Sequence, residues 1–338
     1  MLSAILAKPG EIELQETAIP EPGEGELLVE VKSSLTCGTD LKAFIRGHSL
    51  IPMPGPFGHE FSGIVVEKGR GASKFKVGDQ IMAVHTAPCL SCTYCKKGLF
   101  HLCEILISTK VLGAYAEYIL LPRHIVGQNV FKKPKTLGFS EAAFLEPLAC
   151  VVHGMEPLGI KKGDTVFIIG AGPIGLLHLI LAKSKGAKVL ITGLEEGRLK
   201  TAKKLGADLV FDPSQTIKSV RDLTKGIGAD YIFECTGQPD IWEAAVEYVR
   251  RGGTIVLFGG CKSGAVVRFK AERLHYDEIT LSGTFHFTPQ DVTKAFGLLR
   301  DRKVDVRKLI SGTYPLRDIK EVFAKLAKGD GLKYALTP

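Results

Sequence analysis

Residues 165–175 have the sequence TVFIIGAGPIG. The run Thr165–Ile169 predicts a buried strand that leads directly into three glycines, and the apolar stretch after them predicts a helix over Ile174–Lys185. A strand, a glycine turn and a helix in this order are typical of a dinucleotide-binding unit. The first glycine permits a tight turn, the second lets the backbone approach a pyrophosphate at the helix N-terminus, and the third lets the helix pack closely on the strand. The predicted cofactor contacts are Gly170, Gly172, Pro173, Ile174 and Gly175.

The strands and helices that follow alternate as far as residue 287, which predicts an α/β domain with a doubly wound parallel sheet. Its second strand, Val189–Thr192, ends at Gly193, where such domains usually carry an acid that binds the adenosine ribose. Glu195 and Glu196 follow at once and would repel a 2′-phosphate, whereas Arg198 could pair with one. These opposed signals leave NAD and NADP both open, and we favour NAD.

Up to about residue 145 the pattern is different. Short β-branched runs are separated by glycine and proline, for example Leu27–Val31, Ser62–Glu67 and Ala116–Leu121. This pattern predicts a β-rich, barrel-like domain. The last forty residues show no alternation of strand and helix that we could predict.

The 338 residues are enough for two domains, and 45% hydrophobic with 24% charged residues is typical of a globular protein. The net charge of +8 is spread along the chain, so we expect no nucleic-acid partner. The longest apolar stretch, Val166–Ala182, is interrupted by glycines, a proline and a histidine, so we expect no membrane span. The first thirty residues lack a signal-peptide pattern, which predicts a cytoplasmic protein whose eight cysteines are thiols.

Four of these cysteines are close together in the sequence. Four thiolates at such spacing form a closed tetrahedral zinc set, which has a structural role because no position is left for a substrate. The predicted ligands are Cys89, Cys92, Cys95 and Cys103. A role as small buried hydrophobic residues suits the more isolated Cys150, Cys235 and Cys261 better than a lysine-rich loop.

The segments 37–40 (CGTD), 58–60 (GHE) and 146–148 (EPL), the four-cysteine segment and the glycine turn occur in the order and spacing of the zinc-containing medium-chain dehydrogenases. The chain most resembles their sorbitol (polyol) and threonine dehydrogenase branch. The resemblance implies a GroES-like β-rich catalytic domain over residues 1–145, completed by residues 288–338. It also implies a Rossmann NAD(P)-binding domain over residues 146–287, with the active site in the cleft between the two.

By the same resemblance, Cys37, His59 and Glu146 bind a catalytic zinc, and Glu60 is an intermittent ligand. Two zinc ions per chain, one catalytic and one structural, and a homotetramer or homodimer are implied. The zinc serves as a Lewis acid while hydride passes between a secondary alcohol or polyol, or the corresponding ketone, and NAD(P). Thr39 resembles the hydroxyl that binds the substrate oxygen, and Asp40 the acid that orients the histidine.

Two positions depart from the family. Lys42 stands where many members have a histidine that ends the proton relay, and His286 with Phe287 replaces an Arg-Tyr pair that holds sugar hydroxyls. We therefore expect a smaller or less polar substrate than sorbitol.

Other functions remain open. The chain could be a threonine dehydrogenase or a simple secondary-alcohol dehydrogenase. A zinc-independent reductase and a non-enzymatic zinc-lobe protein that binds a partner are disfavoured by the intact set of ligands and glycines.

Overall fold

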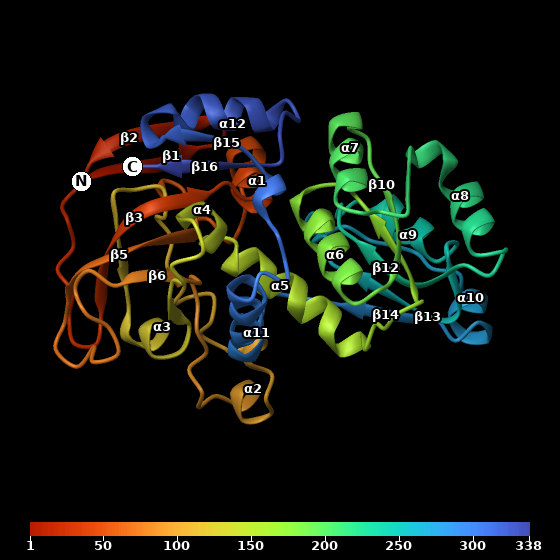
Figure 1. The fold of residues 1–338 in the computed structure, drawn as a ribbon, viewed down its shortest axis with the longest axis horizontal. Helices are drawn as coiled ribbons and strands as arrows, with labels where there is room; N and C mark the ends of the chain where they lie inside the picture. Colours follow the sequence, from red (N-terminus) through yellow and green to blue (C-terminus); the bar gives the residue numbers. More distant parts are fainter. The chain divides into compact units, whose positions relative to one another are not determined.

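The computed structural model describes residues 1–338, apart from the side chain of Ile217. The chain divides into two compact units. Unit 1 consists of Met1–Cys150 together with Phe287–Pro338, and unit 2 of Val151–His286. Figure 1 shows that unit 1 contains both ends of the sequence, in red and blue. Within the part of the chain that the structure describes, no helix is long and apolar enough to cross a membrane.

Unit 2 is built on a sheet of six strands in the order β11-β10-β9-β12-β13-β14, and every neighbouring pair is parallel. The strands are β9 (Thr165–Ile169), β10 (Lys188–Thr192), β11 (Leu209–Phe211), β12 (Ala229–Glu234), β13 (Val249–Leu257) and β14 (Thr280–Gly283). The order runs outward from β9 in one direction and then in the other. Because parallel crossovers are right-handed, this reversal places helices on both faces and confirms the predicted doubly wound sheet.

The helices of unit 2 are α6 (Pro173–Ser184), α7 (Glu196–Lys204), α8 (Thr216–Leu223), α9 (Pro239–Ala245) and α10 (Ala271–Tyr276), with short 3-10 turns Glu156–Leu158 and Pro213–Gln215. The helix α5 (Leu145–Met155) crosses from unit 1 into unit 2. The sheet is apolar on both faces because both are covered, and its core includes Phe167, Leu190, Ile232 and Ile255.

Unit 1 has a three-stranded sheet, β2-β1-β4, and a seven-stranded sheet in the order β15-β16-β3-β5-β6-β8, with β7 paired to β3. The strands are β1 (Leu2–Lys8), β2 (Glu11–Glu16), β3 (Leu27–Leu35), β4 (Gly55–Pro56), β5 (Glu60–Lys68), β6 (Gln80–Ala83), β7 (Tyr118–Leu121), β8 (Val130–Lys132), β15 (Ile310–Pro315) and β16 (Lys333–Thr337). The α-helices are α1 (Gly38–Arg46), α2 (Thr93–Lys96), α3 (Arg123–Gln128), α4 (Phe139–Ala142), α11 (Pro289–Arg300) and α12 (Ile319–Ala327), with 3-10 turns Phe100–Leu102, Arg307–Leu309 and Leu316–Asp318.

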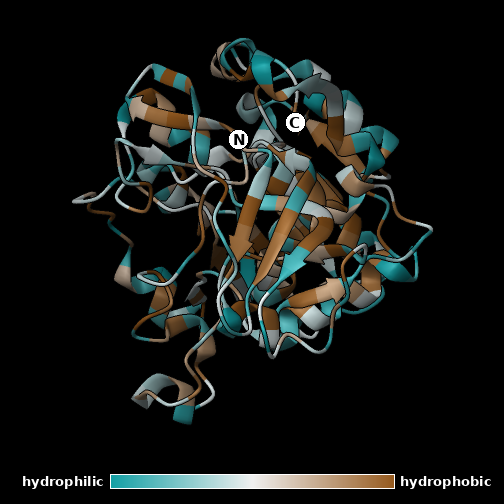
Figure 2. Ribbon diagram, turned by 90° about the vertical axis from the view of Figure 1, so that its left-hand side faces the viewer, coloured by the Kyte–Doolittle hydropathy of each residue, from teal (hydrophilic) through white to brown (hydrophobic). Residues whose placement is uncertain are grey.

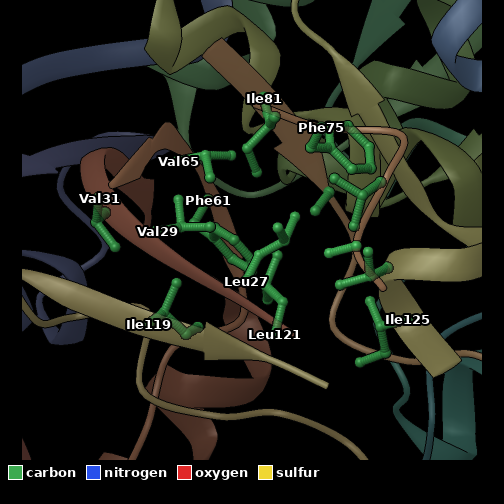
Figure 3. Close-up of a cluster of buried hydrophobic side chains, with 14 of the residues drawn as sticks. Leu27, Val29, Val31, Phe61, Val65, Phe75, Ile81, Ile119, Leu121 and Ile125 are labelled. Atoms are coloured by element: carbon green, nitrogen blue, oxygen red, sulfur yellow. The ribbon is translucent and has the colours of Figure 1, made fainter. Parts of the chain in front are cut away.

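The core of unit 1 lies between strands of which the central ones, β3 and β5, are buried along most of their length. In Figure 2 the strands carry long hydrophobic stretches, drawn in brown, with some white and teal segments. Figure 3 shows the main cluster, where Leu27 and Val29 of β3 converge with Phe61 of β5 and Ile119 of β7. The antiparallel pairing of β3 with β5 runs from Leu27 to Leu35, and it carries residues near position 60 to the end of β3.

The prediction that the last forty residues lack alternation is wrong. They contain β15, α12 and β16, and the two strands pair in parallel around the helix. The helix buries Ile319, Val322 and Phe323 on one face, whereas β15 alternates only between half-buried and exposed residues. That weak pattern, together with Gly312 in the strand, explains why the sequence did not reveal this strand–helix–strand arrangement. Strand β16 then pairs antiparallel with the end of β3.

Candidate active site

The four cysteines of residues 89–103 come together in one lobe around α2, which lies at the lower edge of Figure 1. Their sulfur atoms all lie within 4.8 Å of one another, and the sulfurs of Cys89 and Cys95 are 3.9 Å apart. A tetrahedral zinc with Zn–S bonds of about 2.3 Å separates its sulfurs by about 3.8 Å. The spacing of the lobe therefore fits a zinc ion.

The surroundings of these thiols shift their pKa values in opposite directions. Hydrogen bonds from Ser91 and from the backbone N–H of Cys92 lower the pKa of Cys89 to about 6. Burial raises the pKa of Cys95 to about 12. A bound dication deprotonates a coordinating thiol outright, so zinc would remove this difference. Four sulfur donors with this geometry suit a closed structural site.

A second group joins residues that are distant in the sequence. The possible ligand atoms of Cys37, His59 and Glu60 all lie within 4.8 Å of one another. Cys37 is the N-cap of α1, and its sulfur accepts a hydrogen bond from the backbone N–H of Thr39 at 3.4 Å. Glu60 is the first residue of β5 and pairs with Leu35, at the end of β3. The β3–β5 register therefore brings these ligands together.

His59 is held by a buried carboxyl group. Its Nδ1 lies 3.3 Å from Oδ1 of Asp40, which leaves Nε2 as the nitrogen suited to a metal. The other oxygen of Asp40 accepts a hydrogen bond from the hydroxyl of Tyr115 at 2.7 Å. Burial lowers the pKa of His59, but Asp40 and Cys37 outweigh it, and the pKa lies well above its ordinary value. The set of donors and the orientation of the ring both fit zinc.

Glu60 forms a buried ion pair that sequence reasoning missed. The ammonium group of Lys333 in β16 lies 2.7 Å from Oε1 of Glu60, contacts its Oε2 as well, and donates to the backbone carbonyl of Thr36 at 2.8 Å. Burial lowers the pKa of Lys333, but the attraction of Glu60 leaves that pKa raised. Glu60 thus has a buried basic neighbour within hydrogen-bonding distance.

Glu146 lies in α5 beside a histidine that the sequence analysis also missed. Its Oε1 is 3.6 Å from Nδ1 of His85 and 3.8 Å from the sulfur of Cys150. The rings of His85 and His59 lie 4.9 Å apart between centroids. Burial raises the pKa of Glu146 to about 7. Glu146 is not part of the tight group of Cys37, His59 and Glu60, but His85 connects it to His59.

The other residues that the sequence singled out have varied surroundings. Thr39 and Lys42 are both half-buried positions of α1, and neither is in the core. His286 has a φ of 62°, in the left-handed region, and Phe287 is buried with its ring 6.3 Å from that of His85. His85 follows the short strand β6, and no motif or spacing in the sequence distinguished it from an ordinary loop histidine.

The glycine turn of unit 2 connects β9 to α6. Gly170 has a φ of 109°, and a Cβ on Gly175 would lie 1.9 Å from the carbonyl oxygen of Gly170. A Cβ on Gly172 would meet no atom of the described residues within 4 Å. Pro173 is the first residue of the helix and Ile174 the second. The turn is therefore tight at Gly170 and Gly175 and open at Gly172, as a pyrophosphate requires.

The structure leaves no room for a side chain at Gly193. A Cβ there would lie 2.7 Å from the Cβ of Ala171, so an acid at this position would displace the glycine turn. The guanidinium of Arg198 lies 3.6 Å from the carboxyl group of Glu195, one turn of α7 away. Glu195, which would repel a 2′-phosphate, and Arg198, which could bind one, thus lie close enough to interact with each other.

Two family models match the chain. "Alcohol dehydrogenase GroES-like domain" covers residues 23–135 and "Zinc-binding dehydrogenase" covers residues 173–301. The chain is 33% identical to a sorbitol dehydrogenase of Halalkalibacterium halodurans over 97% of its length and 96% of the relative's. It is also 33% identical to a D-arabitol-phosphate dehydrogenase of Enterococcus avium, over 94% and 91% of the two chains.

Solved structures agree with these relatives. A Sinorhizobium meliloti protein described as a zinc-binding dehydrogenase and bound to NADP has a TM-score of 0.90 and 31% identity, over 100% of this chain and 99% of the other. The 2R,3R-butanediol dehydrogenase of Bacillus subtilis has a TM-score of 0.88 and 27% identity, with the same coverage. The expected combination of a GroES-like β-rich fold with a Rossmann fold is confirmed. This chain belongs to the zinc-containing medium-chain alcohol and polyol dehydrogenases, and it is an NAD(P)-dependent oxidoreductase.

Proposed function

We propose that the enzyme transfers hydride between NAD(P) and a secondary hydroxyl flanked by a second polar group, such as a vicinal diol, or the corresponding ketone. The observation that carries this proposal is the group of half-buried Cys37 and buried His59 and Glu60, with the buried carboxyl group of Glu146 nearby. Cysteine, histidine and carboxylate are zinc donors, and three protein ligands leave a position for substrate. Relatives named for sorbitol and D-arabitol phosphate support a polyhydroxylated substrate.

In this proposal Cys37, His59 and Glu146 hold the catalytic zinc, and Glu60 is close enough for intermittent contact. When bound, zinc supplies Lewis-acid stabilisation of negative charge on the substrate oxygen. Asp40 keeps the His59 ring in the orientation that binds metal. The hydroxyl of Thr39 is proposed to hydrogen-bond the substrate oxygen and receive its proton.

The charge balance of the site supports these roles. Lys333 neutralises Glu60, so the buried site does not collect three uncompensated carboxyl groups around Cys37 and His59. The burial that raises the pKa of Glu146 favours its neutral form in the protein alone, and a cation reverses that preference. The geometry thus favours occupation by a dication.

A second zinc in the four-cysteine lobe is proposed from the sulfur spacing. Metal analysis of the purified protein should find about two zinc ions per chain, and about one would refute either the catalytic or the structural site.

For the cofactor we propose NAD over NADP. Glu195 engages Arg198, the residue that would otherwise pair with a 2′-phosphate. The Glu195→Gln variant should therefore raise the ratio of kcat/KM for NADP to that for NAD by about fivefold or more, because a charge that repels the 2′-phosphate is removed. An unchanged ratio would show that Glu195 does not set the preference. The matched control is Glu196→Gln, since Glu196 instead pairs with Lys200 on the exposed side of α7.

The substrate class is tested by following cofactor reduction by its absorbance with vicinal diols, polyols, threonine, 2-butanol and ethanol. We expect the highest kcat/KM for a small diol or polyol, because a buried polar group left unpaired costs about 1–3 kcal/mol. His286→Ala should raise KM for diols and leave KM for 2-butanol unchanged. A higher kcat/KM for 2-butanol or ethanol than for every diol would identify a simple alcohol dehydrogenase, and a maximum for threonine would identify the threonine branch.

Three broader proposals accompany this function. Residues 1–145 with 288–338 form the catalytic domain and residues 146–287 the cofactor domain. The protein acts in the cytoplasm, which its eight free cysteines support. It assembles as a homotetramer or homodimer, which light scattering on the purified protein would test.

A further inference from the structure

The turn that follows β12, residues 235–238, packs against the glycine turn of unit 2. The backbone N–H of Cys235 donates to the carbonyl of Ile169 at 2.9 Å. A Cβ on Gly170 would lie 3.1 Å from the Cγ2 of Thr236. On its other side the turn approaches the end of β13, where a Cβ on Gly259 would lie 2.3 Å from the nitrogen of Gly237. A displacement of this turn would therefore be transmitted to Gly170.

One buried side chain holds the turn in place. Glu234, the last residue of β12, has a relative exposure of 0%. Its carboxyl group accepts hydrogen bonds from the backbone N–H of Thr236 at 2.7 Å and of Gly237 at 3.1 Å, and from the Thr236 hydroxyl. It also accepts one from the indole N–H of Trp242 in α9 at 2.8 Å. Without the Glu234 carboxyl group, all of these donors would lose their acceptor.

We propose that Glu234 is a positioning residue of the cofactor site. By binding the donors of Thr236 and Gly237 it fixes the turn against Gly170, and so fixes the shape of the glycine turn that receives the pyrophosphate. Glu234 does not need to touch the cofactor. This inference rests on the proposed function only in assuming that a dinucleotide binds at Gly170–Gly175.

Trp242 makes the inference measurable. It is the single tryptophan of the chain, and its indole N–H is bonded to the same carboxyl group that holds the turn. We therefore expect its fluorescence emission to change in a saturable way when NAD or NADP is added to the wild-type protein. The Kd from emission should equal the Kd from calorimetry.

The principal test is Glu234→Gln in the zinc-loaded full chain. Glutamine keeps the volume and one acceptor, but its NH2 group faces the N–H donors of Trp242 or Gly237. We expect the cofactor Kd to rise about tenfold, with unchanged zinc content and with kcat at saturating cofactor within about twofold of wild type. Combining Trp242→Phe with Glu234→Gln removes the opposed donor and should restore part of the affinity. Glu243→Gln is the control. Glu243 lies on α9 with Trp242, but its carboxyl group accepts a hydrogen bond from the backbone N–H of Arg268 instead.

Thr236→Val provides a second test if the Glu234→Gln variant does not fold. It removes the hydroxyl donor and keeps the methyl group beside Gly170, and we expect a threefold or larger rise in cofactor Kd, on the order of 0.7 kcal/mol. A wild-type Kd in Glu234→Gln, or in Thr236→Val where the former does not fold, would overturn the inference alone. A fall in zinc content and in the unfolding midpoint with no separate loss of cofactor affinity would also overturn it. If the wild-type protein bound neither NAD nor NADP, both the inference and the proposed function would fall.

Discussion

The two groups of possible metal ligands in unit 1 are built in opposite ways. The four-cysteine lobe takes all its donors from residues 89–103, and it has only a small core that includes Leu106. The second group, Cys37, His59 and Glu60, takes its donors from the segments where β3 ends and β5 begins, and its histidine and glutamate are buried. The lobe has few packing contacts to hold its donors together, whereas the second group lies at the ends of paired strands of the sheet.

This difference determines what each site can contribute. Large apolar side chains of the lobe are exposed, namely Leu90, Tyr94, Leu99, Leu102 and Ile105. Such a segment gains little from burial, and the proposed structural zinc would supply the missing free energy through metal binding. The second group receives its order from packing, so a metal bound there, as proposed, would be available for chemistry rather than needed for folding.

The largest effect in a test of this contrast is expected for Cys92→Ser. The lobe should release its zinc and lose an apparent binding free energy of about 10 kcal/mol. Cleavage by trypsin at Lys96 or Lys97, measured by mass spectrometry, should then accelerate strongly, while the second zinc remains. Resistance to trypsin with one zinc released would show that the lobe folds without its metal.

Removing a proposed catalytic ligand should have the opposite profile. Glu146→Ala should lower kcat on the order of 10³-fold, since the Lewis acid is worth several kcal/mol, with little change in fold or cofactor affinity. Glu146→Cys, which restores a zinc donor, should retain the metal. Near-normal turnover of the alanine variant with both zinc ions bound would transfer the ligand role to Glu60.

The sheet's role in the second group can be tested at Lys333. Lys333→Met leaves Glu60 buried without its cation, and we expect a loss of about 3 kcal/mol in the free energy of unfolding, measured by urea titration. Addition of Glu60→Gln should recover most of this loss. If the single variant lost less than about 1 kcal/mol, the ion pair would not stabilise the site.

The smallest effect is expected at Tyr115, whose ring packs against Gly58 and whose hydroxyl holds Asp40. Tyr115→Phe keeps the ring and removes only the hydrogen bonds of the hydroxyl. Competition with a chelator should show the catalytic zinc bound about tenfold more weakly. Tyr118→Phe, in β7, should leave zinc affinity unchanged, and an equal loss in both variants would rule out a specific role for the Tyr115 hydroxyl.

Features coded by neighbouring residues were predictable. The strand Thr165–Ile169 has its predicted bounds, and the four cysteines come together as their spacing indicated. Both depend on interactions within about twenty residues, where periodicity and spacing are informative. The doubly wound sheet followed because strand and helix signals alternate strongly in a sheet buried on both faces.

Features created by distant pairings were not predictable. Lys333 reaches Glu60 across 273 residues of sequence, and an isolated lysine in a short strand is normally exposed. His85 resembled an ordinary loop residue until the fold placed its ring beside that of His59. The close approach of Gly193 to Ala171 was also invisible, because it depends on how β10 ends beside the glycine turn.

The insertion of unit 2 between the two parts of unit 1 has a consequence for synthesis of the chain. Strand β16 and Lys333 are translated after all of residues 151–286. The whole of unit 2 is therefore synthesised, and can fold, before the last part of unit 1 leaves the ribosome. Until then Glu60 lacks its cation and the end of β3 lacks a neighbouring strand. If the metal site is the one proposed, the newly made protein would acquire its glycine turn before the surroundings of the metal ligands are complete, and activity would have to wait for both.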